Sequence, residues 1–241
     1  MTTSSVEHDK LNINEICNDV NKSLVGEQIS SSKLMMLSEK ARNLLDFLHA
    51  AEKLKCIIRH GWTSTGRPES VADHSWRVAL MVIFCSRCLD KNINLEKTLK
   101  MALIHDIAEI IAGDIPYFLA REGSDAKKIK IKKEQEAMKK IRLMLDKVFG
   151  DEIFSLWEEY EAKRSYEARV VKSIDKIEAQ IQQNEANLST WLECEKTDAT
   201  EGYINQFCNF DSFLKELGRI VVSESEELAK NYSKRMRPES D

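Results

Sequence analysis

Turn-forming residues are scarce in this chain, which contains 8 glycines and 3 prolines in 241 residues. That share is less than half of the roughly 12 % that is usual. Sandwiches and barrels of short strands need a turn about every 8–12 residues, so the scarcity argues against an all-β fold. Apolar residues make up 42 % of the chain and charged residues 32 %, which suits a large buried core under a charged surface. Helices with few tight turns are the expected architecture.

Apolar residues recur at steps of three and four, the signature of amphipathic helices. The first such helix is predicted from Ser32, and residues 59–68 then break the period with two glycines and a proline, which predicts a loop. Pro68 suits the first turn of a second helix, which should end near Leu89. Asn94 is a predicted N-cap of a third helix that extends to Ala112. Further helical patterns cover 125–148, 151–163, 166–190 and 211–230. With no cleanly alternating strand, the sequence predicts an all-α bundle of six or more helices.

Composition also predicts three segments in the chain and the compartment of the protein. The sequence predicts a flexible polar arm over residues 1–31 and a helical domain over 32–190. It predicts a helical extension that packs on this domain over 191–241. The longest apolar run, Val78–Cys85, is shorter than the roughly 18 residues that span a bilayer, so we expect no membrane segment. The N-terminus lacks the apolar core of a secretory signal, which favours a cytoplasmic protein. A net charge of −4 argues against dedicated nucleic-acid binding.

The predicted third helix carries an unusual polar strip. From Met101 to Ala112 every residue is apolar except His105, Asp106 and Glu109, so the segment should be buried nearly all round. At about 100° per residue, the three polar side chains share one side of the helix. Burying an imidazole and two carboxylates costs several kcal/mol unless they are paired or bind a metal.

Two further residues fit a buried metal site. His74 lies on the apolar stripe of the second helix, and Asp175 borders the apolar stripe of a later helix. Taken singly, His74 could be a core histidine, Asp175 could pair with Lys172 or Lys176, and a lysine could pair with Glu109. Together with the His-Asp pair, they offer two imidazoles and two carboxylates. Such a donor set suits one divalent transition metal, for example Mn, Co, Zn or Fe, better than Ca²⁺.

The order His74, then His105-Asp106, then Asp175 resembles the H…HD…D pattern of the HD-domain metal-dependent phosphohydrolases. The amino-acid sequence around these residues, from Leu34 to Asn187, is similar to that of the 5′-deoxynucleotidase branch of that superfamily. Four segments carry this resemblance: RPESVADHSWRVA (67–79), ALIHDIAEIIAGDIP (102–116), LWEEYE (156–161) and SIDKIEAQIQ (173–182).

The resemblance implies an enzyme that hydrolyses deoxyribonucleoside 5′-monophosphates to nucleoside and phosphate, and it implies a homodimer. By position, the matched metal ligands are His74, His105, Asp106 and Asp175. Glu109 matches the residue that transfers a proton. Arg59, Trp62 and Asp114 match residues that meet the phosphate and the sugar. His60 and Gly61 separate Arg59 from Trp62, whereas the two are adjacent in some relatives, so the sugar selectivity stays open. Because no histidine follows His105, the site should hold one metal ion.

Two alternatives stay open at this point. Another HD phosphohydrolase, acting on a nucleoside triphosphate or a modified nucleotide, would need extra cations, and the lysine-rich stretch 127–140 could supply them. A catalytically silent helical scaffold would bind a partner through its N-terminal arm or C-terminal helix. The buried His105, Asp106 and Glu109 argue against the scaffold.

Overall fold

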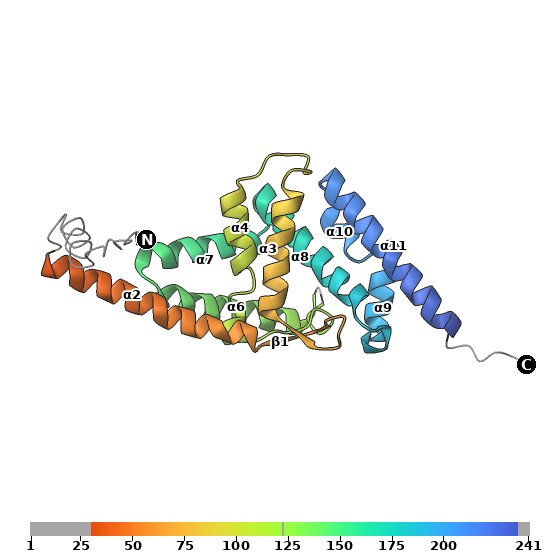
Figure 1. Ribbon diagram of the computed structural model, residues 1–241, viewed down its shortest axis with the longest axis horizontal. Coiled ribbons are helices and arrows are strands. Elements are labelled where there is room, and N and C mark those ends of the chain that lie inside the picture. Colours follow the sequence, from red (N-terminus) through yellow and green to blue (C-terminus); the bar gives the residue numbers. More distant parts are fainter. Residues whose placement is uncertain (1–29, 122, 236–241) are drawn as a thin grey trace, which may run out of the picture. The chain divides into compact units, whose positions relative to one another are not determined.

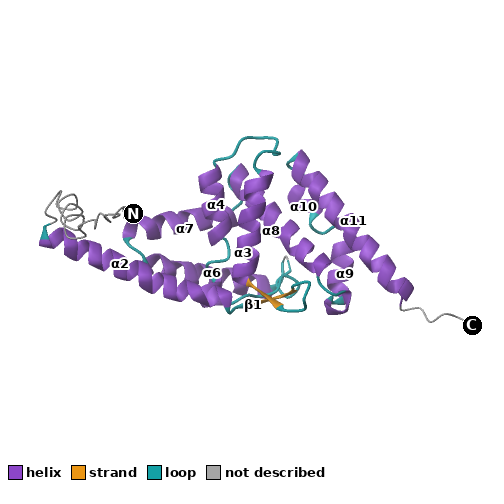
Figure 2. Cartoon of the chain, viewed as in Figure 1, coloured by secondary structure: helices purple, strands orange, loops and turns teal. Residues whose placement is uncertain are grey.

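The computed structural model describes residues 30–121 and 123–235, so nearly all of the predicted N-terminal arm lies outside it. Within these ranges the regular secondary structure is helical apart from one small two-stranded sheet, with loops and turns between the elements (Figures 1 and 2). The all-α prediction is confirmed. None of the described helices is long and apolar enough to cross a membrane.

The predicted first helix is α2, Ser31–Ala51, followed by the short 3₁₀ helix η1, Glu52–Lys55. The boundary between two compact units falls inside α2, after Arg42. Along the predicted apolar stripe of this segment, Leu44, Leu45 and Leu48 are largely exposed, whereas Ala51 and Leu54 at its end are half-buried and pack against the core. Periodicity here predicted the helix correctly but not its burial.

The segment predicted as a loop at 59–68 is partly a hairpin. Strand β1, Ile58–Trp62, pairs antiparallel with β2, Pro68–Ser70, and a turn joins them. Gly66 has φ +83° in that turn, a conformation that favours glycine. Strands this short carry too few residues to show an alternating pattern, which is why the sequence did not predict them. Pro68 lies in β2, so the prediction that it begins a helix is wrong.

Helix α3, Val71–Cys85, begins behind a capping box. The hydroxyl of Ser70 accepts from the backbone N–H of Asp73, and the Asp73 carboxylate accepts from the N–H of Ser70. These two bonds satisfy backbone amide groups at the N-terminal end of the helix, where Ser70 and Val71 are buried. The box therefore sets the start of α3 one turn before His74.

The predicted third helix is interrupted. Helix α4, Leu95–Ile104, begins at Asn94 as predicted, because the Asn94 side chain accepts from the N–H of Lys97. It ends before His105, and α5, Glu109–Ala112, follows a turn with i→i+3 bonds such as Ile107 N–H to Ile104 O. Leu103 and Ile111 are exposed, so burial nearly all round is also wrong.

The remaining helices follow residue 122 in the sequence. They are α6 (Asp125–Met144), α7 (Lys147–Glu161), α8 (Tyr166–Glu185), η2 (Leu188–Thr190), α9 (Glu193–Thr200), α10 (Asn205–Cys208) and α11 (Ser212–Arg235). α6 ends earlier than predicted, because Asp146 caps α7 by accepting from two backbone N–H groups. The predictions for 166–190 and 211–230 match α8 and α11 within a few residues.

Helix α8 runs through the core. It packs against α3, α4, α7 and α11, and its side chains Val170, Val171, Ile174 and Ile177 are completely buried. Full burial of such an aliphatic side chain stabilises the fold by about 1.5–3 kcal/mol. A rigid, close-packed helix at this place can hold polar groups in fixed positions, and it holds Asp175 and Glu178 next to α3.

Candidate metal centre

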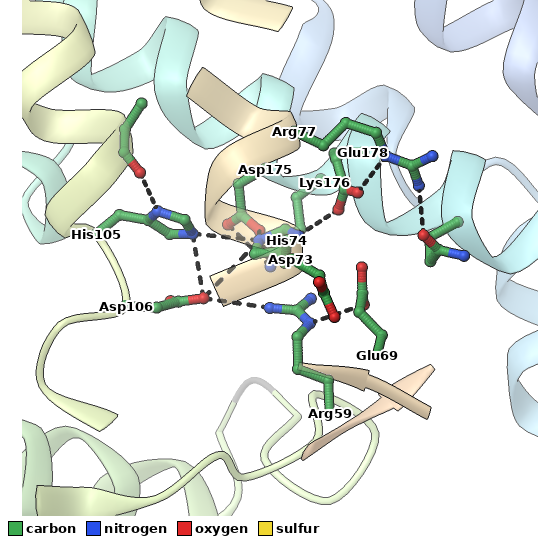
Figure 3. A network of polar contacts seen from close by, with 12 residues as sticks. Arg59, Glu69, Asp73, His74, Arg77, His105, Asp106, Asp175, Lys176 and Glu178 are labelled. Atoms are coloured by element: carbon green, nitrogen blue, oxygen red, sulfur yellow. Dashed lines mark hydrogen bonds and ion pairs between the residues drawn. The ribbon is translucent and has the colours of Figure 1, made fainter. Parts of the chain in front are cut away.

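Four predicted residues meet between α3, the end of α4 and α8 (Figure 3). The Nε2 atoms of His74 and His105 are 3.2 Å apart. Asp106 Oδ2 lies 3.1 Å from His105 Nε2 and 3.8 Å from His74 Nε2. Asp175 Oδ1 lies 3.4 Å from His74 Nε2. His74, His105 and Asp175 are buried and present ligand atoms within 4.8 Å of one another, a spacing that a single cation can bridge.

The other ring nitrogen of each histidine is occupied. His105 Nδ1 donates to the carbonyl oxygen of Ala102 at 2.7 Å, and His74 Nδ1 donates to the carboxylate of Glu178. A neutral imidazole that donates from Nδ1 has a bare lone pair on Nε2. When both rings are neutral, two such lone pairs face each other at 3.2 Å, and only a proton or a cation between them can satisfy both. A divalent cation would satisfy both, so these residues fit a bound metal.

Charge at the centre favours a cation. Burial raises the pKa of Asp106, but the charges of His105, His74 and Arg59 outweigh it and hold that pKa far below its ordinary value. Burial likewise raises the pKa of Asp175, whereas Lys176 and Lys172 lower it well below the ordinary range. Both carboxylates are therefore ionised at neutral pH and can ligate a metal.

His74 itself is under opposing influences. Burial and the charge of Arg59 lower its pKa, Glu178 and Asp175 raise it, and the balance is a pKa of about 9. A proton and a metal compete for the same lone pair on Nε2. The carboxylates that attract a proton to this ring therefore also attract a divalent cation.

Asp175 has three partners besides the histidine. Tyr160 donates its hydroxyl to Asp175 Oδ2 at 2.8 Å, and the ammonium groups of Lys172 and Lys176 lie 3.3 and 3.2 Å from the same atom. The alternative pairing of Asp175 with a lysine therefore exists in the structure, alongside the contact with His74. Oδ2 thus faces Tyr160 and both lysines, whereas Oδ1 faces His74 and accepts from Lys176 at 3.5 Å.

Arg59 lies on β1 beside the centre. Its Nη1 is 3.2 Å from Asp106 Oδ2, and its Nε is 3.3 Å from Glu69 Oε2. Desolvation by burial lowers the pKa of Arg59, but Asp106 and Glu69 raise it further, so the guanidinium stays charged. The hairpin between β1 and β2 places both Arg59 and Glu69 here, which a simple loop would not do. The arginine is held from two sides, and its Nη2 has no hydrogen-bond or ion-pair partner among the described residues, so it can donate to an anion.

Glu109 begins α5 and is 2 % exposed. Its Oε2 atom makes no hydrogen bond within the described part of the chain. Burial, and then the charges of Asp106 and Asp114, raise the pKa of Glu109 to about 10. Glu109 is therefore protonated at neutral pH and can donate a proton. The alternative pairing of Glu109 with a lysine is absent from the ion pairs of the described residues.

Trp62 and Asp114 lie at the ends of nearby elements. The Trp62 backbone oxygen accepts from the side-chain amide of Gln182 at 2.7 Å, which ties the end of β1 to α8. The Trp62 ring lies edge-on to His60, with centroids 4.9 Å apart. Asp114 follows Gly113, whose φ of +73° turns the chain after α5. Both residues are half-buried.

The sequence interpretation missed the residues that support the ligands. Glu178 is completely buried and also accepts from Arg77 Nε at 2.7 Å. Glu69 is 3 % exposed. Glu178 follows Ile174 by four residues, so an acidic side chain on the apolar stripe of α8 was an available signal. Glu69, His74 and Glu178 form a second buried group of possible metal ligands, but Arg59 and Arg77 already neutralise its carboxylates.

This centre, with its histidine-aspartate pair between helices, defines a helical metal-dependent hydrolase fold. The HD domain family model matches residues 51–209, and the chain belongs to this family. Its members carry a divalent metal, for which the His74, His105 and Asp175 cluster is the candidate site.

Named relatives narrow the comparison. The chain is 40 % identical over 147 residues to 5′-deoxynucleotidase HDDC2 of Homo sapiens, which covers 60 % of this chain and 69 % of that protein. It is 38 % identical over 159 residues to 5′-deoxynucleotidase HDDC2 of Bos taurus, and this match covers 65 % of this chain and 74 % of that protein. It is 37 % identical over 149 residues to 5′-deoxynucleotidase hdd1 of Schizosaccharomyces pombe, and this match covers 59 % of this chain and 72 % of that protein.

Solved structures share the fold. A predicted metal-dependent phosphohydrolase from Magnetospirillum magnetotacticum superposes with a TM-score of 0.65 at 25 % identity, covering 79 % of this chain and 97 % of that one. A conserved hypothetical protein from Pyrococcus furiosus superposes with a TM-score of 0.53 at 31 % identity, covering 73 % and 99 %. Family and fold therefore agree with the geometry of the centre.

Proposed function

We propose that this protein is a metal-dependent 5′-deoxynucleotidase, which hydrolyses deoxyribonucleoside 5′-monophosphates to the deoxynucleoside and phosphate. The observation that carries the proposal is the pair of facing Nε2 atoms of His74 and His105, flanked by Asp106 and Asp175. The relatives named 5′-deoxynucleotidase support the substrate class.

His74, His105, Asp106 and Asp175 would hold one divalent transition metal, with Mn, Co, Zn and Fe as the candidates. A divalent cation bound there supplies Lewis-acid chemistry to a phosphate ester. The four side chains are pre-positioned for it, because Glu178, Ala102 and Tyr160 already hold three of them from outside: His74, His105 and Asp175.

Arg59 is the proposed phosphate-binding residue. A phosphate monoester is a dianion, and a guanidinium can donate two parallel hydrogen bonds to it. Asp106 and Glu69 fix the position of the guanidinium before substrate arrives. This arrangement orients the phosphate next to the metal ligands without a conformational search.

Glu109 is the proposed general acid. The leaving alkoxide of the sugar needs a proton, and a buried carboxylic acid with a raised pKa carries one at neutral pH. Its Oε2 atom lacks a hydrogen-bond partner in the described residues, so it is free to meet the substrate. Asp114, by its charge, helps to keep Glu109 protonated and is the proposed residue on the sugar side.

Trp62 is the proposed selectivity residue. A rigid indole next to the ribose would exclude a 2′-hydroxyl by bulk alone and so favour deoxyribose. Gln182 holds the backbone at Trp62, and His60 lies edge-on to its ring. These contacts limit how far the indole can retreat.

The remaining assignments are also proposals. We propose a cytoplasmic homodimer, with a catalytic domain over residues 32–190 and a helical extension over 191–241. Glu195 in α9 lies 3.3 Å from His60 on β1, and Asp198 accepts from the hydroxyl of Tyr117 at 3.1 Å. These two contacts support an extension that packs on the domain.

A phosphate-release screen tests the proposed function. The protein is incubated with the deoxyribonucleoside and ribonucleoside 5′-monophosphates, each with Mn²⁺, Co²⁺, Zn²⁺ or Fe²⁺, and orthophosphate is measured. We expect hydrolysis of the deoxy substrates that His105→Ala abolishes. Release of inorganic triphosphate from a nucleoside triphosphate would instead favour another HD phosphohydrolase. Equal and metal-independent rates for the protein and His105→Ala would contradict the proposal.

A further inference from the structure

Lys172, whose ammonium lies 3.3 Å from Asp175, also lines a polar cavity that contains no residue of the metal centre. The cavity has a volume of about 330 Å³ and lies between the α7–α8 turn, α8 and α10, elements that run side by side in Figure 1. Three cationic side chains line it, Lys163, Arg169 and Lys172, and none of its lining residues is acidic. The proposed function assigns no role to this cavity.

Two of the three cations that line the cavity have no ion pair among the described residues, while Lys172 feels the charges of Asp175 and Glu161. Among the ion pairs of the described residues, none involves Lys163 or Arg169, whereas Lys172 pairs with Asp175. Like charges gathered around one cavity repel one another and raise the affinity for anions. A multiply charged anion would relieve that repulsion.

Aromatic rings fix two of the cations in place. The Lys163 ammonium lies 5.7 Å from the ring centroid of Phe207, and the Arg169 guanidinium lies 4.0 Å from that of Phe210. Cation–π contacts of this kind are worth about 0.5–2 kcal/mol. Ser173 on α8 donates to the carbonyl oxygen of Phe207, which ties this wall to α8. The cations are thus pre-positioned around the cavity.

Lys163 also has an unusual backbone. Its φ is +49°, and no other non-glycine residue in the described ranges has a positive φ. A left-handed conformation costs a non-glycine residue about 1 kcal/mol or more. Glycine would avoid that cost. Instead, this position carries a lysine whose side chain lines the cavity.

We propose that this cavity binds a chain of phosphate groups, either inorganic or carried by a nucleotide. Lys163 and Arg169 each lie over one face of these two rings, so that face is not open for a base to stack on. Binding should therefore depend on the number of phosphates and not on the base.

Lys172 connects the cavity with the metal centre. Its ammonium donates to the Tyr160 hydroxyl at 2.8 Å and lies 3.3 Å from Asp175 Oδ2. An anion in the cavity competes with Asp175 for this lysine, so occupancy should change the hydrolysis rate. This second part rests on the proposed function, whereas binding itself does not.

Isothermal titration calorimetry of the full chain tests the binding. Tripolyphosphate and the four deoxynucleoside triphosphates are compared, with orthophosphate as the single-phosphate arm and with free divalent metal held constant. We expect similar affinities for tripolyphosphate and all four nucleotides, and at least tenfold weaker binding of orthophosphate. Two results would overturn the proposal: affinities that differ tenfold among the four nucleotides, or no binding of tripolyphosphate. Either result would show that the cavity recognises a particular nucleotide and not the phosphate chain.

Paired variants separate this cavity from the metal centre. Lys163→Gln with Arg169→Gln should weaken tripolyphosphate binding at least tenfold and leave basal deoxynucleotide hydrolysis unchanged. Lys133→Gln with Arg87→Gln removes the same charge from exposed positions elsewhere and should change affinity less than twofold. Equal losses in both pairs, or no loss in the first, would overturn the proposal, and circular dichroism checks that both pairs fold.

The rate measurement is separate from the binding. Tripolyphosphate should change deoxynucleotide hydrolysis at least twofold in the unmodified protein and not in the Lys163→Gln/Arg169→Gln pair. An unchanged rate in both would overturn the connection through Lys172. If the protein hydrolyses no deoxynucleotide, the proposed function fails, while the calorimetric comparison still decides whether the cavity binds phosphates.

Discussion

The carboxylate of Glu178 accepts a hydrogen bond from Nδ1 of His74, a residue 104 positions earlier in the chain. This bond fixes the imidazole so that Nε2 faces His105 and Asp175. Because Glu178 is itself held by Arg77, it acts as a positioning residue. Orientation of one ring therefore depends on packing between α3 and α8.

Glu178→Gln is expected to weaken divalent metal binding roughly 10- to 100-fold, because an amide holds the histidine less strongly than a carboxylate. Metal affinity is measured by titration calorimetry, together with hydrolysis as a function of metal concentration. Glu185→Gln is the matched control, since Glu185 contacts the same Arg77 but lies at the exposed end of α8. If both variants bind metal like the unmodified protein, Glu178 has no positioning role.

Metal removal should abolish activity and lower the melting temperature. A ligand at 100 times its dissociation constant stabilises the folded state by about 2.7 kcal/mol. Chelation of the metal-loaded protein should therefore give a lower melting temperature in scanning calorimetry, and added Mn²⁺ or Co²⁺ should restore it. His105→Ala should show no such response, since it lacks one of the two facing Nε2 atoms.

Glu109→Gln is expected to lower kcat roughly 100- to 10,000-fold, the usual contribution of a general acid. Metal content should be unchanged, which separates this variant from those of the ligands. Because Glu109 must be protonated and its pKa is raised to about 10, activity of the unmodified protein should fall as the pH rises toward that value. The amide variant should lack this alkaline decline. An unaltered pH profile would assign the proton to another group.

Trp62→Ala should reduce the preference for deoxyribose. If the indole excludes the 2′-hydroxyl by bulk, the ratio of kcat/KM for dAMP over AMP should fall roughly 10-fold or more. Trp62→Phe, which keeps an aromatic ring, should preserve most of the ratio. A ratio that is the same in all three proteins would exclude Trp62 as the selectivity residue.

Asp211 should make stability depend on pH. It is 2 % exposed and accepts from the Tyr166 hydroxyl and from the backbone N–H groups of Asp90 and Leu214. Burial raises its pKa, but these hydrogen bonds lower it below the ordinary value. The stabilisation is therefore complete above the unfolded pKa of about 4 and disappears as the pH falls through the folded pKa.

Asp211→Asn is expected to lower the free energy of unfolding by about 1–3 kcal/mol at pH 7. Urea titrations at pH 7, 5 and 3.5 measure the difference from the unmodified protein, which should narrow at the lowest pH. Asp125→Asn changes a side chain that is 90 % exposed and should have little effect at any pH. A difference that does not vary with pH would exclude titration of Asp211 as the cause.

The helices were predictable where the helical apolar pattern continues over many residues and where the capping residue lies close in sequence to the group that it caps. Asn94 lies three residues from the N–H that it caps. The capping box of Ser70 and Asp73 is equally local, but the sequence prediction missed it and began that helix at Pro68. Interruption of the helix at His105 was not predictable, because apolar residues continue through Ile111 and only tertiary packing decides which of them are exposed.

The residue types of the candidate centre could be predicted from the sequence, since His105, Asp106 and Glu109 are polar groups inside an apolar run. What the tertiary structure decided is which atoms meet: the facing Nε2 atoms, the Glu178 carboxylate behind one ring, and the hairpin that brings Arg59 to Asp106. Periodicity and capping depend on neighbours three or four residues away, so one chain segment suffices to reveal them. Contacts between α3, α4 and α8 join residues 31 to 104 positions apart, and only the packed core brings these together.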